Sequence, residues 1–477
     1  MKAPYSSWLT GLEPALRRLY AALRPDFDYV SFLSTDSVGF TIQISQRARS
    51  VSDRNLTTER GTVVRVRKGG LYSEAAFNDL TDQNVDEVAA RIREELSAQM
   101  EILRQTGTEV YETGAVPDEP AEVFAEMETE QLPETADTAA LVSQFTEISS
   151  RTAAAVEGAL DCSIRAQSTH ISKLFFTENR YLRQSYVYSE ERVTILLRTE
   201  AGTRFGTDGH SGQCGPELFA QTEKIAETAA RNAEAMRRAG TVEPGEYEVI
   251  TTPGVSGIIA HEAFGHGVEM DMFVKNRALG KNYIGKRVAS DLVTMHEGAL
   301  CAKNVTSYAF DDEGTLAQDT VEIDHGILKT GICDALSAVR LGTAPTGNGK
   351  RQNFEHKVYT RMTNTVFEPG HDTLEEMIAS IRHGYLLDMP QSGMEDPKHW
   401  GIQCIIALGY EIRDGKLTGK TVTPMVLTGY VPDLLGDISM ATGETEVDGC
   451  GYCGKGYKEW VKVADGGPYL KTKVRLG

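Results

Sequence analysis

The chain has no long apolar run, little cysteine, and fewer basic than acidic residues. None of its 477 residues falls in a stretch that approaches the ~18 consecutive apolar residues of a membrane helix. The seven cysteines are odd in number and mostly scattered, which favours reduced thiols over a disulfide framework. A formal net charge of -19 opposes binding to nucleic-acid phosphates and to anionic lipid. We therefore expect a soluble protein with no direct nucleic-acid partner and no membrane partner.

The N-terminal segment also lacks the features of a signal peptide. Residues 1–26 carry charge in every turn and have neither a continuous apolar segment nor a small-residue cleavage site. We therefore predict a cytoplasmic protein.

Single cores usually stop growing at ~250–300 residues, so a chain of this length should form two or more domains.

The first half of the chain alternates between strand and helix patterns. Residues 28–77 show apolar and polar alternation typical of strands, and residues 85–105 have apolar residues at helical spacing. No Lys or Arg occurs from residue 105 to residue 150, and we predict a solvated acidic loop at about 113–137. More helix and strand patterns follow, and a long helix ends near Gly240, a plausible C-cap.

The second half has a different character, with one short helix pattern near residues 256–272 and mostly strand patterns after it. We place a domain boundary near residue 240. The predicted fold class is α+β, with a sheet-plus-helix domain over residues 1–240 and a strand-rich domain over residues 241–477.

The stretch "SGIIAHEAFGHGVEMDMF" contains His261, Glu262 and His266 in the pattern H-E-x-x-x-H, one residue longer than the zinc-peptidase motif. On a regular α-helix, residues five apart lie about 140° apart and cannot reach one metal ion. A π-helical turn would bring the histidines back to nearly one face, and Gly265 and Gly267 make such a distortion inexpensive. The spacing therefore predicts a π-widened or broken helix; two ordinary helix histidines are the alternative.

A zinc site needs at least a third protein ligand. The residues alone leave several candidates: Glu269 and Asp271 nearby, or a cysteine of the distant "VDGCGYCGKG", which contains Cys450 and Cys453. This C-x-x-C pair is also compatible with a redox dithiol or with an incidental pair on a turn.

Several separated blocks resemble the TldD/PmbA family, the modulators of DNA gyrase. They are "HEAFGHGVEMD", "GKRVASDLVT", "DDEGTLAQDTVEIDHGILK", "TGNGKRQNFEHKVYTRMTNTVFEPG" and "GYCGK". The resemblance implies a barrel-like C-terminal domain and a zinc metallopeptidase that acts on unfolded peptides. Carried over by motif, His261, His266 and Cys453 match the zinc ligands, and Glu262 matches the catalytic glutamate.

Two functions from different classes follow. The first is a zinc-dependent peptidase, a dimer formed with a PmbA/TldE-like paralogue or with itself. The alternative is a non-catalytic, zinc-containing protein that binds peptides or regulates a partner. The base Glu262 discriminates between them, because a pure binding site does not require it. For the peptidase, residues 357–367 are a candidate for a sheet edge to which a peptide substrate can add as a strand, and an ordinary core strand is the alternative.

Overall fold

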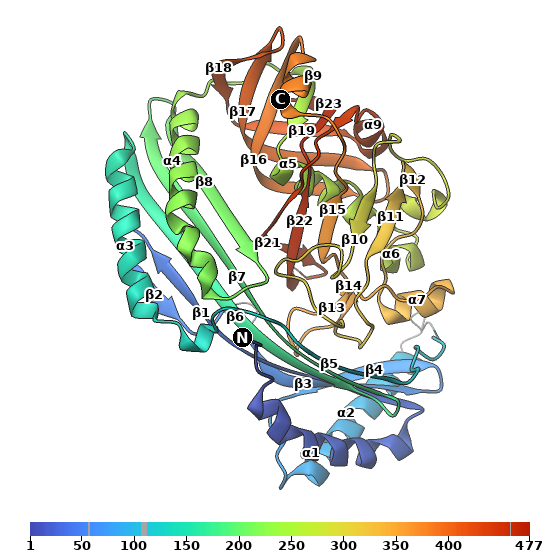
Figure 1. Cartoon of the computed structure of the whole chain (residues 1–477). Helices are drawn as coiled ribbons and strands as arrows, with labels where there is room; N and C mark the ends of the chain where they lie inside the picture. The colour runs from blue at the N-terminus through green and yellow to red at the C-terminus, as the bar shows by residue number, and fades with distance from the viewer. Residues whose placement is uncertain (56–57, 106–111, 458) are drawn as a thin grey trace.

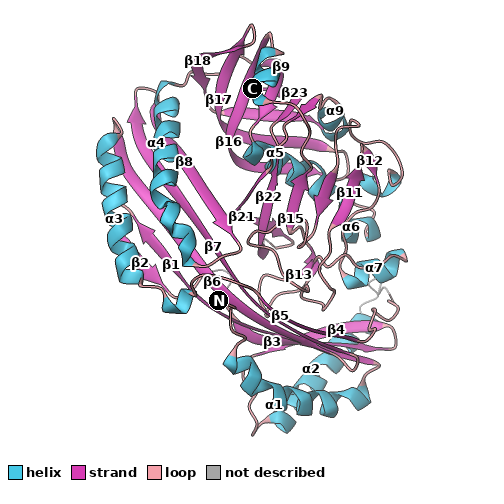
Figure 2. Cartoon of the chain, in the orientation of Figure 1, coloured by secondary structure: helices cyan, strands magenta, loops and turns pink. Residues whose placement is uncertain are grey.

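The computed structural model describes residues 1–55, 58–105, 112–457 and 459–477. Helices and strands are mixed throughout, and the predicted α+β class is confirmed (Figures 1 and 2). A large curved sheet with helices on its outer side forms the first half, and a strand-rich region fills the inner side. Among the described residues, no helix is both long enough and apolar enough to cross a membrane.

The helices are α1 (Ser7–Leu23), α2 (Val85–Gln105), α3 (Thr138–Ala155), α4 (Thr222–Arg238), α5 (Pro253–Ile259), α6 (Met270–Val274), α7 (Ala335–Leu341), α8 (Leu374–Ala379) and α9 (Val431–Gly436). The strands of the first half are β1 (Tyr29–Ile44), β2 (Arg49–Ser52), β3 (Arg60–Lys68), β4 (Leu71–Phe77), β5 (Ala121–Glu126), β6 (Ala159–Phe176), β7 (Arg180–Thr199) and β8 (Gly202–Gly212). Those of the second half are β9 (Gly245–Thr251), β10 (Met295–Glu297), β11 (Thr320–Asp324), β12 (Ile327–Leu328), β13 (Gly349–Lys350), β14 (Tyr359–Thr360), β15 (Asn364–Phe367), β16 (His383–Asp396), β17 (Gly401–Arg413), β18 (Lys416–Val422), β19 (Met425–Tyr430), β20 (Met440–Ala441), β21 (Glu446–Lys455), β22 (Glu459–Gly467) and β23 (Leu470–Leu476).

The N-terminal sheet has the strand order β4-β3-β1-β6-β7-β5, with β2 added to β1 and β8 added to β7. Side chains alternate between the two faces of a strand, and β1 shows the consequence. Phe32 packs into the core under α1 and α2, and Phe40 packs into the core under α3 and α4. The odd-numbered Leu33 faces the other way and contacts the core around Phe310 of the second half. One face of the sheet therefore binds helices, and the other binds the C-terminal region.

The predicted helix over residues 85–105 is confirmed as α2. Helix α1 was not predicted, although its signals are present in the sequence. The Ser6 side chain accepts a hydrogen bond from the Leu9 N–H at the start of α1, and Leu9, Leu12 and Leu16 are buried at helical spacing. The charged Arg17 and Arg18, which argue against a signal peptide, lie on the exposed face of this amphipathic helix.

The acidic segment at about 113–137 differs from the predicted solvated loop. Its residues 121–126 form β5, which pairs in parallel with residues 180–185 of β7. Ala121 and Val123 pack against the buried Leu182 and Phe310, while Glu122 and Phe124 remain exposed. The acidic composition hid an edge strand because the segment has few apolar residues and one of them, Phe124, lies on the exposed face.

The C-terminal region contains a closed barrel in which β16, β9, β23, β19 and β17 pair in turn and β17 pairs back to β16. The implied barrel-like domain is therefore confirmed. A second sheet, in the order β12-β11-β10-β15-β22-β21, lies beside it, and α5 contacts both β22 of this sheet and β16 of the barrel. Within residues 357–367, β15 pairs with β10 on one side and β22 on the other, as in the core-strand alternative, whereas β14 pairs with one described strand, β13.

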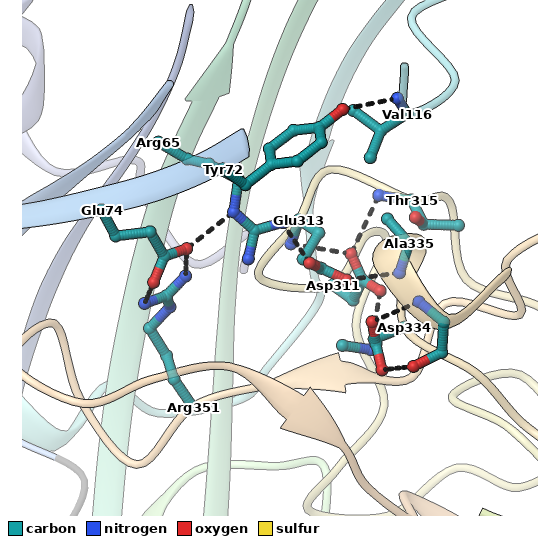
Figure 3. A network of polar contacts seen from close by, with 12 residues as sticks. Arg65, Tyr72, Glu74, Val116, Asp311, Glu313, Thr315, Asp334, Ala335 and Arg351 are labelled. Carbon is teal, nitrogen blue, oxygen red and sulfur yellow. Dashed lines mark hydrogen bonds and ion pairs between the residues drawn. The ribbon is translucent and has the colours of Figure 1, made fainter. Parts of the chain in front are cut away.

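A buried polar network joins the two halves of the chain (Figure 3). Arg65 of β3 donates hydrogen bonds to Glu74 of β4 and to Glu313 of the second half. Arg351 also donates to Glu74, at 3.1 Å between Nη2 and Oε1. Burial opposes ionisation of Glu74, but the Arg351 and Arg65 guanidinium groups lower the pKa of its carboxyl to about 2. Opposite charges thus meet where the N-terminal sheet contacts the C-terminal region.

Candidate metal centre

The segment that carries the two histidines is a distorted helix. Helix α5 ends at Ile259, a π-helical turn spans Ala260–Gly265, and a 3-10 turn follows over His266–Val268. The His266 N–H donates to the carbonyl of His261, five residues earlier. The predicted π-widened helix is confirmed, and its extra residue is what brings two histidines at a spacing of five toward one point.

Small residues allow this helix to lie deep in the protein. A Cβ added at Gly257 would lie 2.4 Å from Oδ1 of Asp465 and 2.7 Å from the backbone nitrogen of Gly466. A Cβ added at Gly265 would lie 2.1 Å from Sδ of Met362. Glycine at both positions therefore permits close packing of the helix on β22 and on the segment before β15.

The structure brings His261 and His266 together with Cys453, which lies 187 residues beyond His266 on β21. One ligand atom from each residue lies within 4.8 Å of the others. Sγ of Cys453 is 3.3 Å from Nε2 of His266, and the two imidazole rings are nearly perpendicular at 87°. Arg361, which is 1% exposed, donates to the carbonyl of Cys453 at 2.5 Å and holds the strand in place.

The three side chains are strongly coupled electrostatically. Burial alone would raise the pKa of the Cys453 thiol, but His266 and His261 hold it well below its usual value. Burial likewise acts to lower the pKa of His261, yet the Cys453 thiolate raises it to about 9. The site therefore stabilises a thiolate, the form of cysteine that binds metal ions.

The other candidates for a third ligand have different positions. Glu269 accepts from Nδ1 of His266 at 3.0 Å, on the side of the ring away from Cys453. Asp271 pairs with Lys455 at 2.8 Å and with Lys275 at 3.2 Å. Neither carboxylate belongs to the cluster of converging ligand atoms found among the described residues.

The second cysteine of the C-x-x-C pair lies elsewhere. The Cys450 thiol is 3.4 Å from the carbonyl oxygens of Glu191 and His210 in the N-terminal sheet. Burial raises the pKa of this thiol well above its usual value, the opposite of what is found for Cys453. The environment of Cys453 therefore favours the thiolate, whereas that of Cys450 favours the protonated thiol.

Glu262 follows His261 directly and is partly exposed. Gly393 of β16 packs against it, because a Cβ added there would lie 2.3 Å from Cγ of Glu262. On the same strand, both carboxyl oxygens of Glu395 are buried, and among the described residues they have no hydrogen-bond partner. Burial raises the pKa of Glu395 to about 9. Sequence reasoning missed Glu395, since a single carboxylate in a β-hairpin carries no spacing signal.

The donor set fits a zinc ion. Two imidazole nitrogens and one thiolate are ligands that Zn²⁺ prefers, and three protein ligands leave a position open for water. The ring of His261 has fewer contacts than that of His266: its Nδ1 is buried, makes no hydrogen bond within the described residues, and lies 3.9 Å from Oδ2 of Asp465. By fold and site, this is an α+β protein with a buried two-histidine, one-cysteine centre able to hold a metal ion.

Residues 244–474 match the model of the PmbA/TldA metallopeptidase C-terminal domain. The resemblance to the TldD/PmbA family is thereby confirmed over this region of the chain.

Individual proteins that are similar to this chain are also named metalloproteases. The chain is 33% identical to a metalloprotease of Methanocaldococcus jannaschii over 59% of its own length and 61% of that protein. It is 30% identical to a zinc metalloprotease TldD homolog of Saccharolobus solfataricus over 50% of its own length and 52% of the relative. The aligned regions thus span between about half and less than two thirds of these relatives. TldE from Thermococcus kodakarensis has the same fold, with a TM-score of 0.77 at 19% identity, covering 97% of this chain and all of that one.

Proposed function

We propose that this protein is a zinc-dependent peptidase that hydrolyses unfolded peptides, with His261, His266 and Cys453 as the metal ligands and Glu262 as the catalytic base. The observation that carries the proposal is the convergence of three donor atoms, within 4.8 Å of one another, from segments far apart in the chain. The names of the metalloprotease relatives support it.

Each group of the site has a separate role in the proposed peptide hydrolysis. Bound zinc would supply a Lewis acid and would lower the pKa of a water molecule toward ~7. Glu262 is adjacent to a ligand and partly exposed, so its carboxylate can accept a proton from the attacking water and return it to the leaving amine nitrogen. His266 is held by Glu269, and the Cys453 backbone is held by Arg361, so two of the three ligands are supported by neighbouring side chains.

We further propose a domain organisation for the chain and a partner chain with which it forms a dimer. We assign the metal centre and its peptidase activity to a domain over residues 241–477, with residues 1–240 as a separate α+β domain. We also propose that the chain acts as a dimer, with a PmbA/TldE-like paralogue or with a second copy. The fold that it shares with TldE supports a pairing between two similar chains.

The test separates catalysis from zinc binding. Glu262→Gln should keep about one zinc per chain and lower peptide cleavage by roughly 10²–10⁴-fold, because it removes the base and spares the ligands. Glu375→Gln, an exposed carboxylate of α8, is the matched control and should change neither quantity. Zinc content and cleavage of an unfolded peptide are measured on each protein. Wild type that binds zinc and cleaves nothing would support the non-catalytic binding protein, and undiminished cleavage by Glu262→Gln would refute the role of Glu262.

A further inference from the structure

His266 uses its two ring nitrogens for different purposes. Nε2 faces Sγ of Cys453 at 3.3 Å, and Nδ1 lies 3.0 Å from Oε2 of Glu269. Glu269 is 2% exposed, and a carboxylate can only accept a hydrogen bond, so Nδ1 must carry the proton. The lone pair of the neutral ring is then on Nε2, directed at the cluster. Glu269 thus fixes the tautomer that a metal ligand needs.

Glu269 is in turn held by Lys455. Its Oε2 lies 3.0 Å from Nζ of Lys455, which also donates to Oδ1 of Asp271 at 2.8 Å and to the carbonyl of Thr360 at 3.0 Å. Three acceptors thus match the three N–H groups of the ammonium. Lys455 comes two residues after Cys453 on β21, and residues two apart on a strand project from the same face.

The result is a double connection between β21 and the helical segment. Cys453 faces His266, and Lys455 holds Glu269, three residues after His266. His261 lacks comparable support, because its Nδ1 is 3.9 Å from Asp465, too far for a hydrogen bond. The two imidazoles of the site are therefore held unequally.

We infer that Lys455 is a positioning residue of the metal centre: through Glu269 it sets the tautomer and orientation of His266 and thereby raises the affinity for zinc. This role rests on the proposed zinc site and adds a residue that touches neither the metal nor the substrate. Hydrogen-bond partners of ligating histidines typically contribute 10–100-fold to metal affinity.

The experiment compares the zinc dissociation constants of full-length variants by competition with a chromophoric chelator. Lys455→Met should weaken zinc binding by roughly 10–100-fold. Lys275→Met is the matched control. Lys275 is exposed and also pairs with Asp271, but in the described part of the chain it does not pair with Glu269. It should leave the dissociation constant unchanged. The absorption spectrum of the cobalt-loaded protein gives a second readout, and Lys455→Met should alter its ligand-field bands while Lys275→Met should not.

A double variant distinguishes positioning from simple charge balance. Lys455→Met leaves the buried Glu269 without its cation, which can by itself destabilise the protein. Adding Glu269→Gln removes that unpaired charge, but the amide can turn either its oxygen or its NH₂ toward His266 and no longer fixes the tautomer. Positioning predicts that E269Q/K455M still binds zinc weakly, and recovery of wild-type affinity would overturn the inference. Unchanged affinity in Lys455→Met would also overturn it and leave the proposed function standing, whereas wild type without zinc would refute the proposed function itself.

Discussion

Two clusters of buried polar groups in this protein can be compared directly: the Arg65 network between the two halves, and the metal centre. In the network, Glu74 meets both Arg65 and Arg351, and Glu313 meets Arg65 (Figure 3). At the metal centre, by contrast, two imidazoles and a thiolate direct their ligand atoms at one another.

The difference teaches how to separate a structural cluster from a functional one. A cluster whose opposite charges pair within the protein stabilises the fold and needs no ligand. A cluster of lone-pair donors that face a common point is complete only with a cation. Residue type alone does not distinguish the two, because both clusters are buried and rich in ionisable side chains. The direction of the donor atoms does.

The largest effect is expected at the metal centre. Cys453→Ser removes a thiolate ligand and should weaken zinc binding by more than the ~100-fold that an outer hydrogen-bond partner contributes. Cys450→Ser is the control three residues away, because its thiol contacts backbone carbonyls of the N-terminal sheet and not the histidines. Zinc content after dialysis against a weak chelator measures the difference. Equal zinc in both variants would show that Cys453 is not a ligand.

A substitution in the Arg65 network should lower the stability of the protein and leave its zinc affinity unchanged. Arg65→Met leaves Glu313 buried without its cation and should lower the free energy of unfolding by about 3–5 kcal/mol, with zinc affinity unchanged. Arg91→Met breaks the exposed pair with Asp79 and should cost only about 0–1 kcal/mol. Urea unfolding followed by circular dichroism measures both. A loss of zinc affinity in Arg65→Met would show that the two clusters are not independent.

The smallest expected effect concerns the helix that carries the histidines. Gly257→Ala places a methyl group 2.7 Å from the backbone nitrogen of Gly466, so the helix must move, at a cost of about 1–3 kcal/mol. Zinc affinity should fall as well, because His261 moves with the helix. Gly11→Ala in the exposed part of α1 meets no atom within 4 Å and should stabilise the protein by up to about 1 kcal/mol. Unfolding and zinc titration of both variants test this, and unchanged zinc affinity in Gly257→Ala would show that the close packing is not needed for the site.

Much of the fold was predictable from local patterns. Helix α2 follows from apolar residues at helical spacing, and the strand-rich second half follows from alternation. The π-helical turn was also predictable, since two histidines five apart can share a metal only if the helix widens. Strand β5 was not, because its acidic composition outweighed a short apolar alternation. The sequence could not decide between an edge strand and a core strand over residues 357–367 either, since a strand's neighbours are set by long-range pairing.

By itself, the sequence determined the α+β class, the need for a distorted helix at His261 and His266, and a short set of candidates for the third ligand. Only the tertiary structure decided among those candidates. In it, Cys453 lies next to the histidines, Cys450 lies against the N-terminal sheet, and Glu269 lies on the side of the His266 ring away from Cys453. It also brought Lys455 to Glu269. The physical reason is that a metal centre is defined by where donor atoms meet in space, and residues 187 positions apart meet only through the packing of β21 against the helix.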